Sequence, residues 1–138
     1  MKKSLLALAA VLCCGFSGTV LADMEKAAYK AEKDKIEATA KADKKACDSM
    51  KGNTKDICQA EAKAKEKVAK AELDAKDKPG AAADEKVKLM KAEATYEVAK
   101  EKCEDMKGAE MTKCKADAKA AHETAKAEVK AAAAPKKS

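Results

Sequence analysis

The feature that most constrains this chain is an internal duplication that carries paired cysteines. The stretch from Glu37 to Lys63 recurs from Glu93 to Lys119, at an offset of 56 residues and without a gap. Alanine and lysine would match through biased composition alone, but two cysteines, a methionine, a glycine and a threonine match at the same offset. The chain therefore contains two copies of one structural unit, each with two cysteines.

Glycine and proline divide these copies into four predicted helices. Each copy has a glycine halfway between its cysteines, Gly52 or Gly108, which we expect to adopt the left-handed conformation that ends a helix. Between the copies, Pro79 and Gly80 interrupt the helical pattern, and Asp84 can cap the next helix by accepting from its free backbone N–H groups. We expect helices at 24–51, 54–77, 84–107 and 110–132.

Apolar residues recur at helical spacing along these segments. One seam steps by three and four residues without interruption: Leu89, Ala92, Tyr96, Ala99, Cys103 and Met106. A similar stripe in the last helix comprises Met111, Cys114, Ala118, Ala121, Ala125 and Val129.

In the first copy, Asn53 or Thr54 can start the second helix. We also expect ion pairs one turn apart within helices, namely Glu61–Lys65, Glu66–Lys70 and Glu72–Lys76.

Large apolar side chains are scarce. After residue 22 only 15 side chains other than cysteine are apolar and larger than alanine. Each contributes about 1.5–3 kcal/mol if fully buried, whereas ordering a domain of this size costs on the order of 100 kcal/mol. A thick globular core is excluded, and β-branched and aromatic residues are too sparse for a β protein. The sequence predicts an all-α fold of two tandem disulfide-stapled helical hairpins, elongated or packed as a slender bundle.

The first 22 residues have the three parts of a secretory signal peptide. Lys2 and Lys3 precede an apolar run from Leu5 to Cys14, and Ala22 ends a cleavage site before Asp23. We therefore expect a periplasmic protein that does not span a membrane after cleavage. The expected organisation is a signal peptide (1–22), hairpin repeat 1 (23–77), a linker (78–84), hairpin repeat 2 (85–132) and a disordered tail (133–138).

Four cysteines remain after the leader, and in an exported chain thiols are normally oxidised. If each glycine marks a hairpin tip, the two cysteines of one copy lie on facing helices about one turn from the tip. This favours Cys47–Cys58 and Cys103–Cys114, each contributing roughly 3 kcal/mol in the chain-entropy model. The crossed alternative, Cys47–Cys114 with Cys58–Cys103, would need each copy to be one continuous helix, and the glycines argue against it.

A sulfur-based metal site is the alternative function. Two Cys-x-x-Met pairs, with a further methionine and a histidine nearby, offer soft ligands of the kind that hold Cu(I): Cys47, Met50, Cys103, Met106, Met111 and His122. A periplasmic Cu(I)-buffering protein of this kind requires reduced thiols, and packing explains the methionines equally well. The lone histidine lies in an alanine-rich helix, where we expect an exposed surface residue. We expect no cofactor.

Composition excludes several other function classes. The chain has no arginine, no tryptophan and one histidine, and no acid–base or nucleophile set can be assembled, so we do not expect an enzyme. After the leader, 28 lysines face 24 acidic residues that are interleaved with them, which disfavours nucleic-acid binding. The sequence predicts a non-catalytic periplasmic protein with a structural, binding or envelope-associated role. Its partner stays open: anionic envelope components, client proteins and a second copy of the chain all fit.

Three segments, 29–37, 46–61 and 96–103, resemble a group of small exported proteins of Gram-negative bacteria with the same paired-cysteine duplication. The resemblance covers nearly the whole chain after the leader. Some members carry the description cell envelope biogenesis protein TolA, which implies an envelope location but no activity and no role for any residue. We expect neither the retained membrane anchor nor the C-terminal globular domain of TolA itself, and hence no transmission of force across the envelope.

Overall fold

The computed structural model describes residues 25–133, which form four helices in two hairpins. The helices are α1 (Lys26–Ala46), α2 (Asn53–Asp77), α3 (Ala81–Cys103) and α4 (Gly108–Ala133), with a short 3-10 turn at Cys47–Ser49. No β-strand occurs in this range. The all-α class and the hairpins are thus confirmed, whereas the predicted signal peptide and the tail beyond residue 133 lie outside the described residues.

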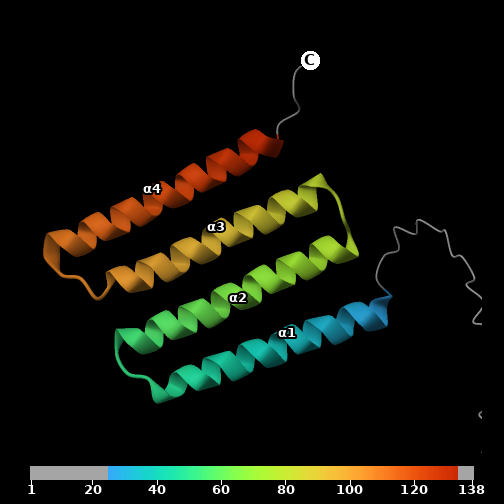
Figure 1. The fold of residues 1–138 in the computed structure, drawn as a ribbon, viewed down its shortest axis with the longest axis horizontal. Helices are drawn as coiled ribbons and strands as arrows, with labels where there is room; N and C mark the ends of the chain where they lie inside the picture. Colours follow the sequence, from blue (N-terminus) through green and yellow to red (C-terminus); the bar gives the residue numbers. More distant parts are fainter. Residues whose placement is uncertain (1–24, 134–138) are drawn as a thin grey trace, which may run out of the picture.

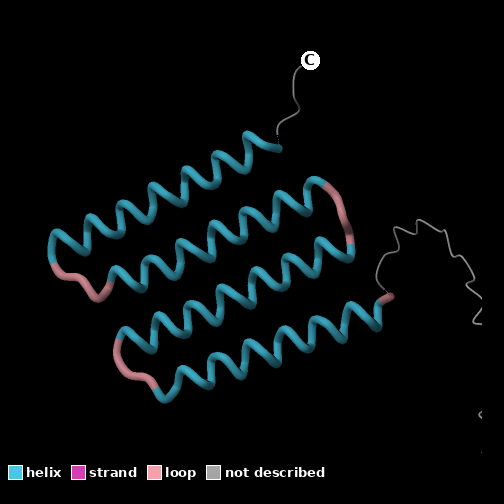
Figure 2. Tube along the Cα trace, viewed as in Figure 1, coloured by secondary structure: helices cyan, strands magenta, loops and turns pink. Residues whose placement is uncertain are grey.

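The four helices run alternately up and down in a single layer (Figure 1). Each packs only against its neighbours in chain order: α1 against α2, α2 against α3, and α3 against α4. Both hairpin tips lie at one end of the layer, and the turn between the hairpins lies at the other (Figure 2). Of the two arrangements that the sequence left open, the packed one is found, with the hairpins side by side.

The start of α3 differs from the expected position. The helix begins at Ala81 rather than near Asp84, and Gly80 occupies the N-cap position. Three consecutive alanines, the best helix formers, extend the helix back to Gly80, whose carbonyl accepts from the Asp84 backbone N–H at 3.0 Å. Asp84 lies in the first turn, where its charge still complements the positive end of the helix dipole. The linker is correspondingly shorter than the predicted 78–84.

The glycines at the hairpin tips have the expected positive φ but a different place in the chain. Gly52 and Gly108 both have φ of 57°, and they adjoin the start of the second helix of each hairpin instead of ending the first. Asn53 does not cap α2: Gly52 occupies the N-cap position, and the side-chain amide of Asn53 donates to the Glu101 carbonyl at 2.8 Å. That bond joins the start of α2 to the end of α3.

The interior is as thin as the composition predicts. Most of its buried side chains are alanines, such as Ala62 and Ala71, and Leu73 is the single larger aliphatic side chain that is buried within residues 25–133. Cys47 and Cys103 are completely covered at the hairpin tips. Disulfides therefore occupy positions where a larger protein would place bulky apolar residues.

The interface between the hairpins is more apolar than the outer helices at the equivalent positions. Val68 of α2 and Val98 of α3 are half-buried beside each other's helix. Their counterparts one repeat away, Thr124 of α4 and Ala42 of α1, are exposed. The duplication has thus kept the helices but not the surfaces, and larger apolar residues concentrate where hairpin meets hairpin.

Candidate functional site

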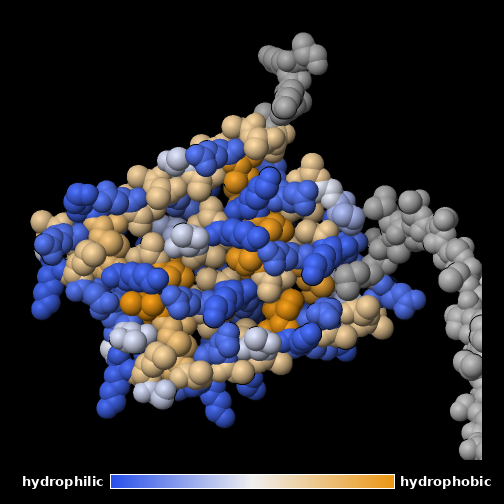
Figure 3. All heavy atoms as spheres, viewed as in Figure 1, coloured by the Kyte–Doolittle hydropathy of each residue, from blue (hydrophilic) through white to orange (hydrophobic). Residues whose placement is uncertain are grey.

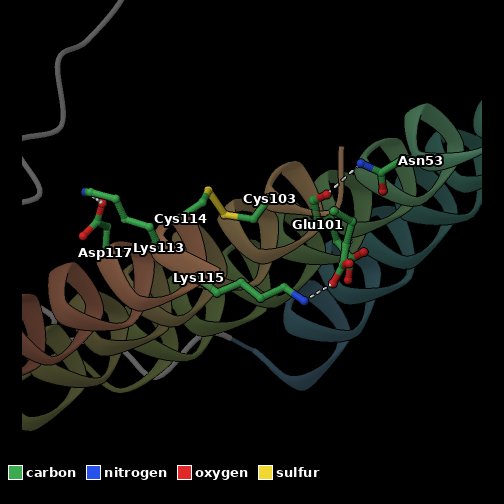
Figure 4. The surroundings of a disulfide bond; sticks show 8 residues. Asn53, Glu101, Cys103, Lys113, Cys114, Lys115 and Asp117 are labelled. Carbon is green, nitrogen blue, oxygen red and sulfur yellow. Dashed lines mark hydrogen bonds and ion pairs between the residues drawn. A yellow bond between two sulfur atoms is a disulfide. The ribbon is translucent and has the colours of Figure 1, made fainter. Parts of the chain in front are cut away.

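Two disulfides close the hairpin tips. Cys47 is bonded to Cys58 and Cys103 to Cys114, with Cα–Cα distances of 5.7 and 5.6 Å and a sequence separation of 11 in each case. Figure 4 shows the second bond, with Asn53 and Glu101 nearby. This is the local pairing, and it follows from the chain reversal between each pair of cysteines.

The two disulfides take up the cysteines that the copper hypothesis uses as ligands. The cysteines of the predicted set could hold Cu(I) only as thiolates, and Cys47 and Cys103 are both in disulfides. Met50 and Met106 are 39% and 43% exposed in the turns. Within residues 25–133, no three histidine, cysteine or carboxylate side chains come together as a metal site would need.

His122 is buried, so the expectation of an exposed surface residue is wrong. Its ring stacks on Tyr96 with the centroids 4.7 Å apart and the planes 2° from parallel. Its Nε2 is covered and lies 3.0 Å from Glu93 Oε2, without the alignment of a hydrogen bond. The buried stripe of α4 passes through His122 instead of the neighbouring Ala121, which is exposed.

Many ion pairs cross between helices. Glu61 and Glu72 of α2 pair with Lys102 and Lys91 of α3, at 3.4 and 2.8 Å, instead of with lysines one turn away. The expected pair within α2, Glu66–Lys70, is present at 2.8 Å. Tertiary packing has therefore redirected two of the three pairs predicted from spacing.

Glu66 is the centre of the contact between α1 and α2. It accepts from Lys44 at 2.6 Å and from Lys70, which also pairs with Glu37 at 3.1 Å. The hydrogen bonds from Lys44 and then Lys70 lower the pKa of Glu66 to about 2. The pKa of Lys70 is raised, chiefly by its bond to Glu66. This network holds the edge helix α1 in place.

Asp74 joins three helices away from the hairpin tips. Tyr29 of α1 donates its hydroxyl to Asp74 at 2.7 Å, and Lys86 of α3 donates to the other carboxylate oxygen at 2.8 Å. The bond from Lys86, followed by that from Tyr29, lowers the pKa of Asp74. The pKa of Tyr29 is raised because its hydroxyl hydrogen is held by the carboxylate.

An open groove of about 730 Å³ runs between the two central helices. Its floor is apolar and includes Ala64, Val68, Ala94 and Val98, while charged side chains line the rim. A cavity of about 340 Å³ between α3 and α4 shares residues Lys91, Thr95 and Ala99 with it, so both open on one face of the layer. Apolar and charged side chains alternate over the face drawn in Figure 3.

Exposed lysines form a row on the edge helix α1. Lys26, Lys30, Lys33 and Lys41 are all exposed, and their spacing places them on one side of the helix, with the exposed Glu37 between Lys33 and Lys41 on that same side. Among the described residues, none of the four forms an ion pair with a carboxylate. We call these four residues the α1 lysine row. Sequence reasoning noted the excess of lysine but missed this row, although the spacing alone contains the signal.

Comparisons with protein-family models, with curated proteins and with solved structures found no match to this chain. The resemblance to small exported proteins stays a prediction. Over residues 25–133, no helix combines the length and the apolar character that crossing a bilayer requires.

Proposed function

We propose that this chain is a non-catalytic periplasmic protein with a structural and binding role at the cell envelope, and that the α1 lysine row contacts anionic envelope components. The observation that carries the proposal is the row itself, formed by Lys26, Lys30, Lys33 and Lys41. It spans about 22 Å of an edge helix at 1.5 Å per residue. The row lies beside α2, since Glu37, which is between Lys33 and Lys41 on the same side of α1, pairs with Lys70 of α2; a surface that contacts the row would therefore lie along one face of the layer.

The energetics of such a contact are adequate. A lysine near an anionic surface contributes about 1 kcal/mol, so four lysines contribute about 4 kcal/mol, from which the repulsion of Glu37 is subtracted; its ion pair with Lys70 reduces that repulsion. These lysines form no ion pair with described carboxylates. Few interactions within the protein are therefore lost when the lysines contact a phosphate-bearing surface. The attraction falls with added salt, since the Debye length shortens to about 8 Å at physiological ionic strength.

Two further observations support the periplasmic and non-catalytic parts of the proposal. Disulfides persist in oxidising compartments, and each hairpin is closed by one. The imidazole of His122, the only one in the chain, is packed on Tyr96 with its Nε2 covered, which disfavours a role for that nitrogen as a general acid or base.

Binding of the oxidised chain, from Asp23 onward, to lipid vesicles tests the proposal. We expect binding to vesicles that contain phosphatidylglycerol, weak binding to phosphatidylcholine alone, and release at high salt. Replacing the α1 lysine row by glutamine should weaken binding by more than about tenfold.

A matched control removes the same charge elsewhere. Lys51, Lys63, Lys107 and Lys119 are also exposed, and they form two pairs of repeat equivalents. Their replacement by glutamine should leave most of the affinity intact. Equal losses in both variants would show that only net charge matters and would overturn the role of the row. Absence of binding at low salt would overturn the proposal as a whole.

A further inference from the structure

We infer that the groove between α2 and α3 is covered by the same groove of a second copy of this chain. The groove lies in the middle of the layer and has an apolar floor. Domains usually bury such faces against a second layer of secondary structure, but each helix here packs only on its chain neighbours. A second copy would supply the missing layer.

The charges on the rim are divided between the two helices. The acids Glu61 and Glu72 belong to α2, and the lysines Lys102 and Lys91 belong to α3. Each acid lies directly across from its lysine, at 3.4 and 2.8 Å respectively. Lys65 is the exception on α2, and it also lines the cavity toward α1. At two positions along the groove, the α2 wall is therefore acidic and the α3 wall opposite it is basic.

This division fits a two-fold axis that runs along the groove. Such an axis turns the second copy over and places its α2 above α3 of the first copy, with levels along the helices unchanged. Glu61 of the second copy then lies above Lys102, and its Glu72 lies above Lys91, while the reciprocal contacts form as well. The other face-to-face arrangement has its two-fold axis across the groove; it would place α2 of the second copy above α2 of the first and bring acid onto acid, so the charges favour the axis along the groove.

Apolar content and size agree with this arrangement. Val68 and Val98 line the groove at its axis, whereas their repeat equivalents on the outer helices are Thr124 and Ala42. Two adjacent helices of about 23 residues present a face of about 35 by 20 Å, or about 700 Å². That is close to the roughly 800 Å² per partner of a standard stable interface.

A charge-swap experiment tests the inference in the oxidised full-length mature chain. The swapped variant combines Glu61→Lys, Glu72→Lys, Lys91→Glu and Lys102→Glu, which keeps both ion pairs within a chain and inverts the two walls. Wild type and swapped variant should each be dimers by sedimentation equilibrium. In an isotope-labelled mixture measured by native mass spectrometry, the mixed dimer should fall well below its statistical fraction, because like charges would then face each other across the interface.

Single substitutions give a second readout with a matched control. Val68→Lys places a charge on the axis and should shift the chain to monomer, with helicity verified by circular dichroism. Thr124→Lys makes the same change at the repeat-equivalent exposed position and should leave the dimer intact. A wild-type chain that is monomeric at all accessible concentrations would overturn the inference, as would free mixing of wild type with the swapped variant. A monomer that instead binds an amphipathic helical peptide in the groove would assign the groove to another partner and also overturn it.

Discussion

The contribution of the two disulfides to stability can be worked out from the chain. Each bond closes a loop with a sequence separation of 11. In the chain-entropy model, a loop of this length reduces the entropy of the unfolded chain by an amount worth about 2.8 kcal/mol at 25 °C. The entropy of unfolding is near 2.1 cal/mol/K per residue, or about 230 cal/mol/K for the roughly 110 described residues. Loss of one bond should therefore lower the melting temperature by about 12 °C.

We therefore expect two double variants, Cys47→Ala with Cys58→Ala and Cys103→Ala with Cys114→Ala, to lose similar amounts of stability. Each should lose about 3 kcal/mol, slightly more than the entropy term because Cys47 and Cys103 are also fully buried. Removing both bonds should cost about 6 kcal/mol, which reaches the lower end of the roughly 5–15 kcal/mol that stabilises ordinary domains. The chain without bonds should then lose its tertiary packing at physiological temperature.

Urea denaturation followed by far-ultraviolet circular dichroism measures these losses, and reduction of the wild-type chain provides the same comparison without removing side chains. Partial helicity should persist after reduction because alanine, lysine and glutamate favour helices. Losses below about 1 kcal/mol in both double variants would refute the reasoning. They would mean that helix propensity and ion pairs, not the bonds, compensate for the thin interior.

Three further substitutions test other parts of the fold. Glu66→Gln should lower the free energy of unfolding by about 1 kcal/mol at neutral pH, as measured by urea titration; this figure allows for the half-exposed lysines. Because the pKa of Glu66 is lowered in the folded state, the difference from wild type should vanish as the pH falls from about 4.5 toward 2. A difference that stays constant with pH would contradict this. Gly52→Ala should cost about 1–3 kcal/mol because φ of 57° with ψ of −152° is accessible only to glycine, whereas Lys51→Ala beside it should be nearly neutral. Leu73→Ala should cost about 2–3 kcal/mol by thermal unfolding and more than Leu89→Ala, since Leu73 is 5% exposed and Leu89 is only half-buried.

The groove and the lysine row would give the two sides of the protein different tasks. The groove face carries the apolar surface and the divided charges, which suit a second copy of the chain. The α1 lysine row lies on an edge helix, so it can contact an anionic surface if the groove is covered. Dimerisation would then double the number of rows that one assembly presents, which raises avidity for an extended surface without any new type of contact.

The sequence by itself determined what depends on near neighbours in the chain. A glycine between two cysteines predicts a chain reversal, and a reversal within 11 residues brings those cysteines together, so the hairpins and the local bonds follow. Helix number follows from Pro79, Gly80 and the duplication for the same reason. The helix boundaries shifted by a few residues, because Ala81 to Ala83 extend α3 at almost no cost in free energy.

Only the tertiary structure decided how each helix is rotated about its own axis. Glu61 has Lys65 one turn away and Lys102 across the groove, and a pair within the helix contributes only about 0.2–0.5 kcal/mol, too little to fix the partner of Glu61. His122 and Ala121 are adjacent, and which of them faces Tyr96 depends on that same rotation. Alanine-rich helices have weakly marked apolar sides, so their rotation is set by contacts between distant parts of the chain, and the buried histidine and the divided charges of the groove arise from those contacts.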